Sequence, residues 1–212
     1  MISPRQPERA SDVIGPREPE RLRARVGSRR WVLTLASLTG ITALSIDMSL
    51  PAQPTLVREL AVGPDVAQLT LGLFLAGYAC GQLMFGFLSD SLGRRRVLLG
   101  GLVIFTIAGA ACAAAPSIGL LLAARIVQGF GAAAAPVIAR AMVRDTQPAA
   151  SAARMLSTIM AVLALAPMIA PILGSWLLAH LGWHAIFVTL ALIGSGFTAM
   201  SALTLQIGRA HV

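Results

Sequence analysis

Six long apolar stretches take up most of the chain. They lie at approximately residues 31–52, 67–88, 97–115, 118–141, 155–178 and 185–205. Each is close to the ~20 residues that an α-helix needs to cross the ~30 Å hydrocarbon core of a bilayer. Because lipid cannot hydrogen-bond to backbone amides, segments that span a bilayer in this way must be helical. The sequence therefore predicts an all-α transmembrane protein with six spans.

The composition agrees with a membrane protein. Charged residues make up only 12% of the chain, whereas soluble globular proteins carry about 25%. Both cysteines, Cys80 and Cys112, lie inside apolar stretches without disulfide or metal spacing, so we interpret them as small packing residues. His180 and His184 have no carboxylate near them in a short connection, and neither a metal nor another cofactor is expected. The longest connection, residues 53–66, holds no nucleophile with a base, so an enzyme is not predicted.

The arginines predict the orientation of the spans. Every basic residue is an arginine, and the net charge is +8. If the spans alternate in direction, one side of the membrane receives the arginines of residues 1–30, 89–96 and 140–154. The other side receives only Arg58. Since basic residues accumulate on the cytoplasmic side, we predict a cytoplasmic N-terminus, and the basic composition requires no nucleic-acid partner.

The two ends of the chain are interpreted separately. Residues 1–30 are polar and rich in proline and arginine, so we predict a disordered cytoplasmic tail rather than a signal peptide. Residues 207–212 match an in-frame translation of a common sequencing adapter, so we interpret them as foreign and expect the natural chain to continue. A native stop codon directly after Val212 in genomic DNA would contradict this interpretation.

Two charged residues, Asp47 and Arg125, lie within apolar stretches rather than between them. Counting 1.5 Å per residue, each is roughly 6–10 Å inward from the outer end of its helix. Because a charge inside a span costs about 2.5–3.5 kcal/mol on insertion scales, we predict that the two pair, directly or through water. Gln128, three residues after Arg125, is expected to share its hydrogen bonds. The alternatives are an interfacial Asp47 and an Arg125 that reaches the outer surface.

The connection between the second and third stretches combines glycines with charges. Its residues of interest are Gly86, Asp90, Gly93, Arg94 and Arg95. We expect Gly86 to permit a close helix contact and Gly93 a tight turn. Asp90 falls at the C-terminal end of a predicted helix, where a negative charge is unfavourable, so Arg94 or Arg95 is expected to pair with it. The preference for cytoplasmic positive charge alone explains the arginines but neither Asp90 nor the glycines.

The fifth stretch contains two prolines. Pro167 and Pro171 are four residues apart, beside a stripe of small residues formed by Ala166, Ala170 and Gly174. Each proline removes a backbone hydrogen bond and favours a kink. Ordinary helix packing is the alternative to a functional bend.

Together these motifs resemble those of the major facilitator superfamily. Residues 86–95 are similar to its G-x-x-x-D-(R/K)-x-G-R-(R/K) motif, with Ser91 where many members carry a basic residue. Residues 125–132 resemble R-x-x-Q-G-x-G-A, and residues 166–174 resemble the antiporter motif G-P-x-x-G with alanine before the first proline. Residues 47–54 are similar to the D-M-Y-L-P-A-x-P of Bcr/CflA drug-resistance transporters.

The resemblance implies a fold and a set of roles. The fold is the six-helix N-terminal bundle of a twelve-helix protein, made of two inverted three-helix repeats. Asp47, Arg125 and Gln128 are implied in proton coupling at the central cavity. Residues 86–95 are implied in a conformational lock against the second half, and residues 166–174 in a hinge or a seal against leak.

The function that the resemblance implies is proton-coupled export of small drug-like molecules, such as chloramphenicol or bicyclomycin, by alternating access. Tyr78 and Gln82, four residues apart, are weaker candidates for the substrate cavity, with packing as the alternative for Tyr78. Expected partners are the substrate, protons, lipid and a C-terminal six-helix half, in the plasma (inner) membrane of a bacterium. The alternatives are export of a natural metabolite or sugar, or a membrane fragment that does not transport.

Overall fold

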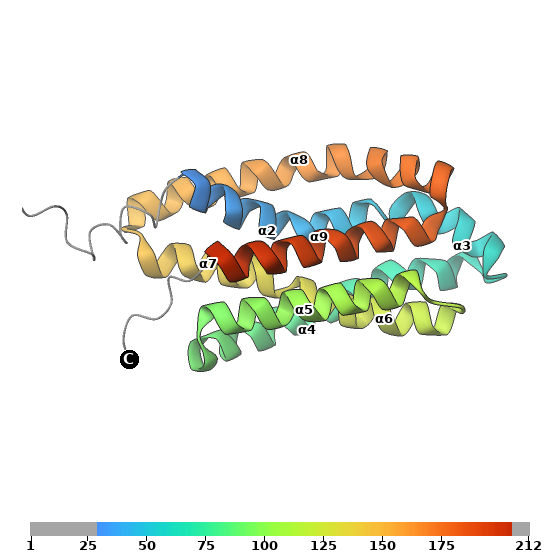
Figure 1. The fold of residues 1–212 in the computed structure, drawn as a ribbon, viewed down its shortest axis with the longest axis horizontal. Coiled ribbons are helices and arrows are strands. Elements are labelled where there is room, and N and C mark those ends of the chain that lie inside the picture. Colours follow the sequence, from blue (N-terminus) through green and yellow to red (C-terminus); the bar gives the residue numbers. More distant parts are fainter. Residues whose placement is uncertain (1–28, 205–212) are drawn as a thin grey trace, which may run out of the picture.

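A computed structural model describes residues 29–204 as a bundle of long helices in which successive spans run in opposite directions (Figure 1). Residues 1–28 of the predicted tail (1–30) and the proposed foreign end at 207–212 lie outside the described residues, while residues 29 and 30 begin the first helix. The elements are α2 (Arg29–Asp47), η1 (Leu50–Ala52), α3 (Gln53–Glu59), α4 (Pro64–Leu92), α5 (Arg94–Ala113), α6 (Ile118–Ala132), α7 (Ala134–Thr146), α8 (Ala149–Leu181) and α9 (Trp183–Thr204). They form six segments that are long and apolar enough to cross a membrane.

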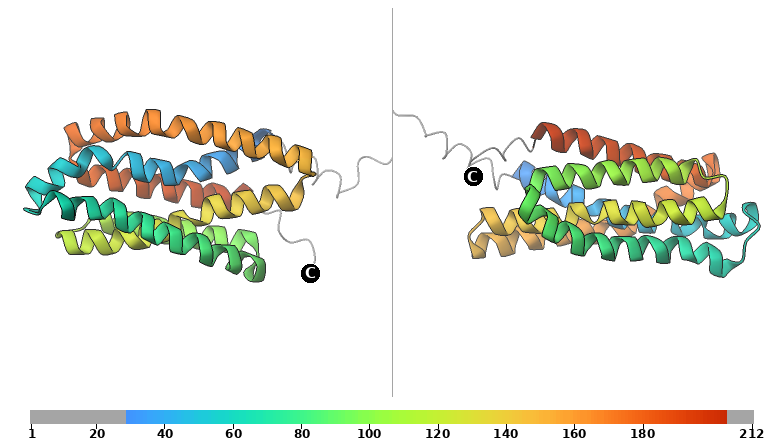
Figure 2. Two further views of the ribbon diagram at one scale, coloured as in Figure 1. Left: turned by 180° about the vertical axis from the view of Figure 1, so that it is seen from behind. Right: turned by 90° about the horizontal axis from the view of Figure 1, so that it is seen from below.

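The helices do not pack in chain order. The most extensive contacts join α4 to α6, α5 to α6 and α9, and α2 to α8. The left view of Figure 2 shows that α4, α5 and α6 lie together at one edge of the bundle and α8 at the other. Arg125 lies in α6, which is therefore surrounded by α4 and α5 rather than by α2.

The first span differs from its prediction. Residues 31–52 were expected as one helix and 53–66 as a loop, but a short 3₁₀ turn and α3 continue the helical path to Glu59. Pro51 and Pro54 each stand at the first positions of one of these segments. Proline is tolerated there because the first amides of a helix have no intrahelical acceptor. The prolines thus divide the span into segments without ending it.

The fourth span is also divided, at Ala133 between α6 and α7. Pro136 has no amide hydrogen with which to bond the carbonyl of Ala132, four residues earlier. The Thr42 hydroxyl of α2 donates to that carbonyl at 3.4 Å. A neighbouring helix therefore satisfies the backbone group that the proline leaves open, as bilayer-embedded backbone requires.

Glycines allow α4 and α6 to lie in backbone contact. A Cβ atom on Gly129 would come 2.0 Å from the Phe74 carbonyl oxygen, and one on Gly77 would come 2.0 Å from that of Ile126. In lipid, helix association depends on such close packing because the apolar surroundings offer little hydrophobic driving force. This contact fixes the distance between the two helices around Arg125.

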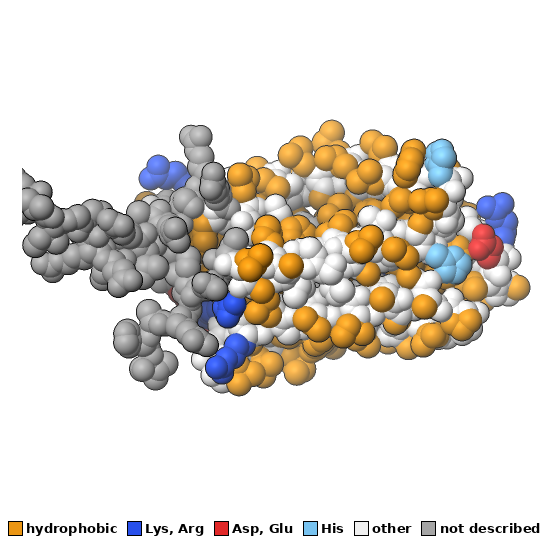
Figure 3. Space-filling view, viewed as in Figure 1, with side chains coloured by type: hydrophobic (Ala, Val, Ile, Leu, Met, Phe, Trp, Pro, Cys, Tyr) orange, Lys and Arg blue, Asp and Glu red, His pale blue; other side chains and the backbone are white. Residues whose placement is uncertain are grey.

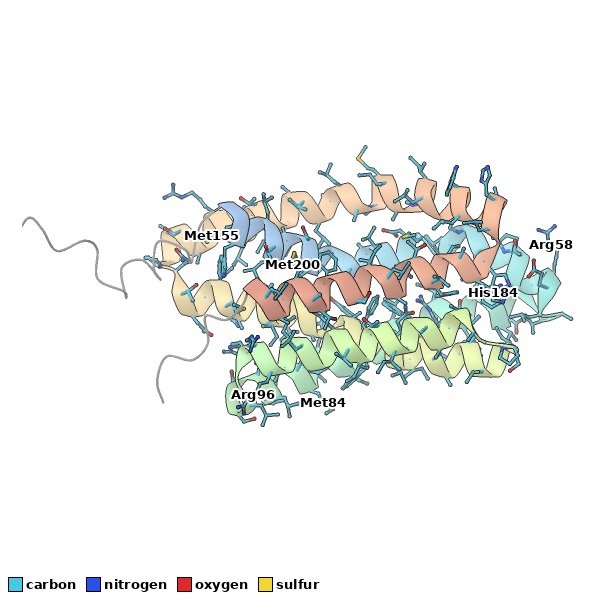
Figure 4. All side chains as sticks on the ribbon, in the orientation of Figure 1. Arg58, Met84, Arg96, Met155, His184 and Met200 are labelled. Atoms are coloured by element: carbon cyan, nitrogen blue, oxygen red, sulfur yellow. The ribbon has the colours of Figure 1, made fainter. Side chains whose placement is uncertain are left out.

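The two ends of the bundle differ in charge. Arg96 lies at one end and Arg58 at the other (Figure 4). In the space-filling view, several basic side chains gather at the first end, while His and acidic side chains accompany Arg58 at the second (Figure 3). The basic end is the one that the sequence predicts to face the cytoplasm.

Candidate functional site

Arg125 lies on α6 and is fully buried. Its Nε donates to the backbone carbonyl of Thr70 at 3.1 Å, and its Nη1 donates to Gln128 Oε1 at 2.9 Å. The guanidinium carbon lies 4.2 Å from the ring centroid of Phe74 and 5.7 Å from that of Phe187. Nη2 is buried without a hydrogen-bond partner. The predicted contact with Gln128 is present, and Arg125 is held by groups that carry no charge.

The predicted direct pair between Asp47 and Arg125 is not formed in this conformation. Among the described residues, the salt bridges are those of Arg94 alone. Asp47 is the last residue of α2 and is partly buried. α2 packs chiefly on α8 and α7, while the Arg125 side chain is turned toward α4. Counting residues along each helix gives the depth of Asp47 and Arg125 in the membrane, but it does not give the direction in which each side chain points.

Sequence reasoning missed the residues of α4 that hold Arg125. Thr70 is buried, and its hydroxyl accepts a hydrogen bond from Gln53 Nε2 at 3.0 Å while its carbonyl binds Arg125. Phe74, one helical turn later, is also fully buried. The only signal in the sequence is their i, i+4 spacing, which places both on one face of α4. That spacing is common in any packed helix and identifies no partner.

The charged cluster at the basic end matches its prediction in part. Arg94 Nη1 lies 2.7 Å from Asp90 Oδ1, which confirms one of the two pairings expected for Asp90. Arg94 also contacts Ser89 and reaches Asp145 of α7, with 3.0 Å between Nε and Oδ2. Arg94 thus joins the end of α4 and the start of α5 to α7.

Arg95 has a separate task. Its Nη2 donates at 2.8 Å to the backbone carbonyl of Ala202, in the last turn of α9. The last carbonyls of a helix lack intrahelical donors, and a cation there is favourable for the helix dipole. Arg95 therefore attaches the start of α5 to the end of α9 and does not pair with Asp90.

The two glycines of this connection behave differently. Gly93 has a φ of +87°, which an L-residue with a side chain rarely adopts, so the predicted tight turn is confirmed. Gly86 was expected to permit a close helix contact, but a Cβ atom there would meet nothing within 4 Å. Within the described part of the chain that expectation is wrong, because Gly86 faces outward from the bundle.

Replacing Arg94 with alanine should lower the thermal stability of the chain in detergent. Two ion pairs disappear, and since both are partly exposed we expect a loss of about 1 kcal/mol that shrinks in high salt. Circular dichroism during heating measures this effect. The matched control is Arg96→Ala, because Arg96 is exposed on the same turn. Equal losses for the two variants would contradict the bridging role of Arg94.

The prolines of the fifth span lie inside one continuous helix, α8. Pro167 is exposed, whereas Ala170 and Gly174 are buried. A Cβ atom on Gly174 would come 2.4 Å from the carbonyl oxygen of Met48, so this side of α8 packs on the residue that follows α2. The small-residue stripe is therefore a packing surface within this bundle, and a hinge or seal at the prolines stays a prediction.

The remaining candidates are less informative. Tyr78 is partly buried and packs against the hydrophobic core, which agrees with the packing alternative. Gln82 is partly exposed one turn further along α4. Their place in a substrate cavity stays a prediction.

The two histidines are engaged by tryptophans. His180 stacks on Trp176 and His184 on Trp183. Glu59 accepts a hydrogen bond from Nε1 of Trp183, the ring on which His184 stacks, at 2.8 Å. The described residues contain no cluster of three His, Cys, Asp or Glu side chains suited to a metal ion.

The family model and the known proteins that match this chain point to the same family. The family model described as "Major Facilitator Superfamily" matches residues 35–209. The MFS-type transporter YdgK of Bacillus subtilis is 39% identical over 82% of this chain and 45% of its own. A bicyclomycin resistance protein homolog of Haemophilus influenzae is 36% identical over 77% of this chain and 41% of its own. A chloramphenicol resistance protein of Pseudomonas aeruginosa is 39% identical over 81% and 40%.

A solved structure agrees on the fold. The bacterial homolog of the human lysosomal transporter Spinster aligns with a TM-score of 0.64 at 18% identity, covering 93% of this chain and 45% of its own. At this identity the likeness concerns the fold alone. The chain spans a little under half the length of the curated relatives that it matches.

Proposed function

The chain belongs to the Major Facilitator Superfamily of membrane transporters, and from this premise we propose that it forms the N-terminal half of a proton-coupled exporter of small drug-like molecules. The drug-resistance names of two relatives support the substrate class. The basic end of the bundle supports an N-terminus in the cytoplasm of a bacterium. A second six-helix half would complete the transport path.

The observation that carries the proposal is the burial of Arg125 without an acidic partner. A cation inside a membrane span is costly unless it faces a partner or a cavity, and such residues usually serve ion or substrate pathways. Arg125 has four neutral hydrogen-bond or ring partners, and its Nη2 has no hydrogen-bond partner. The buried guanidinium therefore attracts an approaching anionic group strongly, because no other charge among the described residues neutralises it.

Asp47 is the described carboxylate that can supply such a group. It ends α2, whereas Arg125 lies on α6. In the proposed mechanism, Asp47 is neutral when protonated and has little attraction to Arg125. After it releases the proton, the anion is drawn toward the buried cation, so proton release favours a conformation in which the two approach. Because both residues lie in this half, their approach requires a movement of α2 relative to α6, while rocking of the two halves would open the substrate path to alternate sides.

The Arg94 cluster supports a lock at the cytoplasmic end. Asp90 has a side chain that is 69% exposed although Arg94 binds one of its oxygens. It therefore retains acceptor capacity on the outside of the bundle. We propose that the second half contacts Asp90 there and that this contact breaks when the transporter opens inward.

Drug susceptibility with an uncoupler tests the proposal. Cells that produce the complete transporter should tolerate a higher concentration of chloramphenicol or bicyclomycin and should accumulate less of the drug than control cells. An uncoupler should remove this difference in accumulation. Cells that produce only the 212-residue chain serve as the control and should show no protection. Protection that persists with the uncoupler would refute proton coupling, and the absence of any drug phenotype would favour a metabolite or sugar as the substrate.

A further inference from the structure

Cys112 of α5 contacts the residue that holds Arg125. Its Sγ lies 3.7 Å from Gln128 Oε1, a distance at which a thiol donates a hydrogen bond to an amide oxygen. Cys112 and Gln128 are both completely buried. The sequence alone suggested only a small packing residue, so the structure adds a polar contact to this cysteine.

Two donors meet at the same oxygen of Gln128. Arg125 Nη1 donates to Oε1 from one helix and Cys112 Sγ from another. An amide oxygen has two lone pairs and accepts both, whereas the amide nitrogen carries only donors. If the Gln128 amide turned over, its NH₂ group would face two donors. The thiol therefore favours the same amide orientation that Arg125 needs.

The shape of α5 supports this orientation. Gln128 Nε2 has no hydrogen-bond partner. It lies beside Gly109, where a Cβ atom would be 3.2 Å from Nε2 and 3.3 Å from the Cβ of Ala191. Gly109 and Cys112 are three residues apart and so share one face of α5. This face admits the amide nitrogen at the glycine and binds the amide oxygen at the cysteine.

We propose that Cys112 is a positioning residue for Arg125, acting through Gln128; the functional part of this inference rests on the proposed role of Arg125 in proton coupling. The thiol holds the amide oxygen toward the guanidinium, which keeps Nη1 occupied and leaves Nη2 as the free donor. The described groups around Arg125 from α4, α6 and α9 are uncharged and do not titrate. Cys112 is the titratable neighbour from α5.

Infrared spectroscopy of the chain itself tests the contact without any transport. The S–H stretching band falls in a region free of other protein bands, and Cys80→Ala leaves Cys112 as the only thiol. We expect the band of the folded chain to lie below that of an alkanethiol in an apolar solvent, which marks the free-thiol position, because a hydrogen bond weakens the S–H bond. Gln128→Met should move the band of the folded chain to the free-thiol position.

An S–H band at the free-thiol position in the folded Cys80→Ala chain would overturn the proposal. This comparison stands even if the Gln128→Met variant does not fold. The result is also independent of transport, so it separates failure of this inference from failure of the proposed function, which would appear as an absence of proton-linked flux in the unaltered transporter.

Transport by the complete protein tests the consequence. Cys112→Ala should lower the rate of proton-driven efflux about threefold and move the pH at which efflux is half-maximal, since a weak S–H···O bond is lost. Cys112→Ser retains a donor and should restore both values. Cys80→Ala, at the exposed cysteine, is the matched control and should change neither. An unchanged pH profile for Cys112→Ala, or no rescue by serine, would contradict the positioning role.

Discussion

Arg125→Ala is expected to abolish proton-driven export by the complete transporter while the protein still inserts into the membrane. The substitution removes a buried cation whose described partners are all neutral, so no opposite charge is left unpaired. Insertion should therefore not suffer, because a charge inside a span is itself unfavourable. Transport should fall to background because ionised Asp47 then has no cation to attract it, so release of its proton no longer favours one conformation. Drug efflux and membrane protein content, measured in the same cells, check both parts.

Two further variants make the Arg125 experiment specific. Arg125→Lys keeps the charge but loses the planar group that binds Thr70 and Gln128 at once, and we expect a strong loss of efflux. Arg58→Ala removes an exposed arginine of α3, at the C-terminal end of the first span, and should leave efflux unchanged. Normal efflux by Arg125→Ala would show that its charge is not needed for coupling. Equal losses for Arg58→Ala and Arg125→Ala would show that the effect is not specific to the buried site.

The second large effect is expected from Gly129→Ala. The added methyl group would lie 2.0 Å from the Phe74 carbonyl oxygen, so α4 and α6 would have to move apart. Overpacking of this kind typically costs 1–3 kcal/mol. The same separation should weaken the bond between Arg125 Nε and the Thr70 carbonyl, because these two residues lie one turn earlier on the same two helices. We therefore expect a lower melting temperature in detergent together with reduced transport.

Gly72→Ala and Gly119→Ala are the matched controls for this prediction. They lie on the same two helices, α4 and α6, but a Cβ atom at either position meets nothing within 4 Å. Alanine has the higher helix propensity, so the melting temperature should stay the same or rise slightly. A Gly129→Ala chain as stable as these controls would contradict the close contact between α4 and α6.

The spans could be predicted from sequence because bilayer thickness sets their length. Their interruptions could not be placed in the same way, since Pro51 and Pro54 start new helical segments while Pro167 and Pro171 remain inside one helix. The outcome depends on neighbouring groups as well as on the proline, as the Thr42 hydroxyl beside Ala132 illustrates.

The site was predictable only where its contacts are local. The pair of Asp90 and Arg94, and that of Arg125 and Gln128, follow from spacings of four and three residues. Asp145 lies 51 residues from Arg94, and no pattern in the sequence joins them. The contacts of Arg125 with Thr70, and of Gln128 with Cys112, likewise depend on which helices become neighbours.

Proton movement measured together with substrate movement tests whether Arg125 couples export to protons. The complete transporter is reconstituted in liposomes that contain a pH-sensitive dye. Chloramphenicol or bicyclomycin is then added on one side, without an imposed pH gradient. We expect a substrate-dependent pH change in the lumen that is absent with Arg125→Ala. Substrate transport by the unaltered protein without any accompanying proton movement would contradict this coupling.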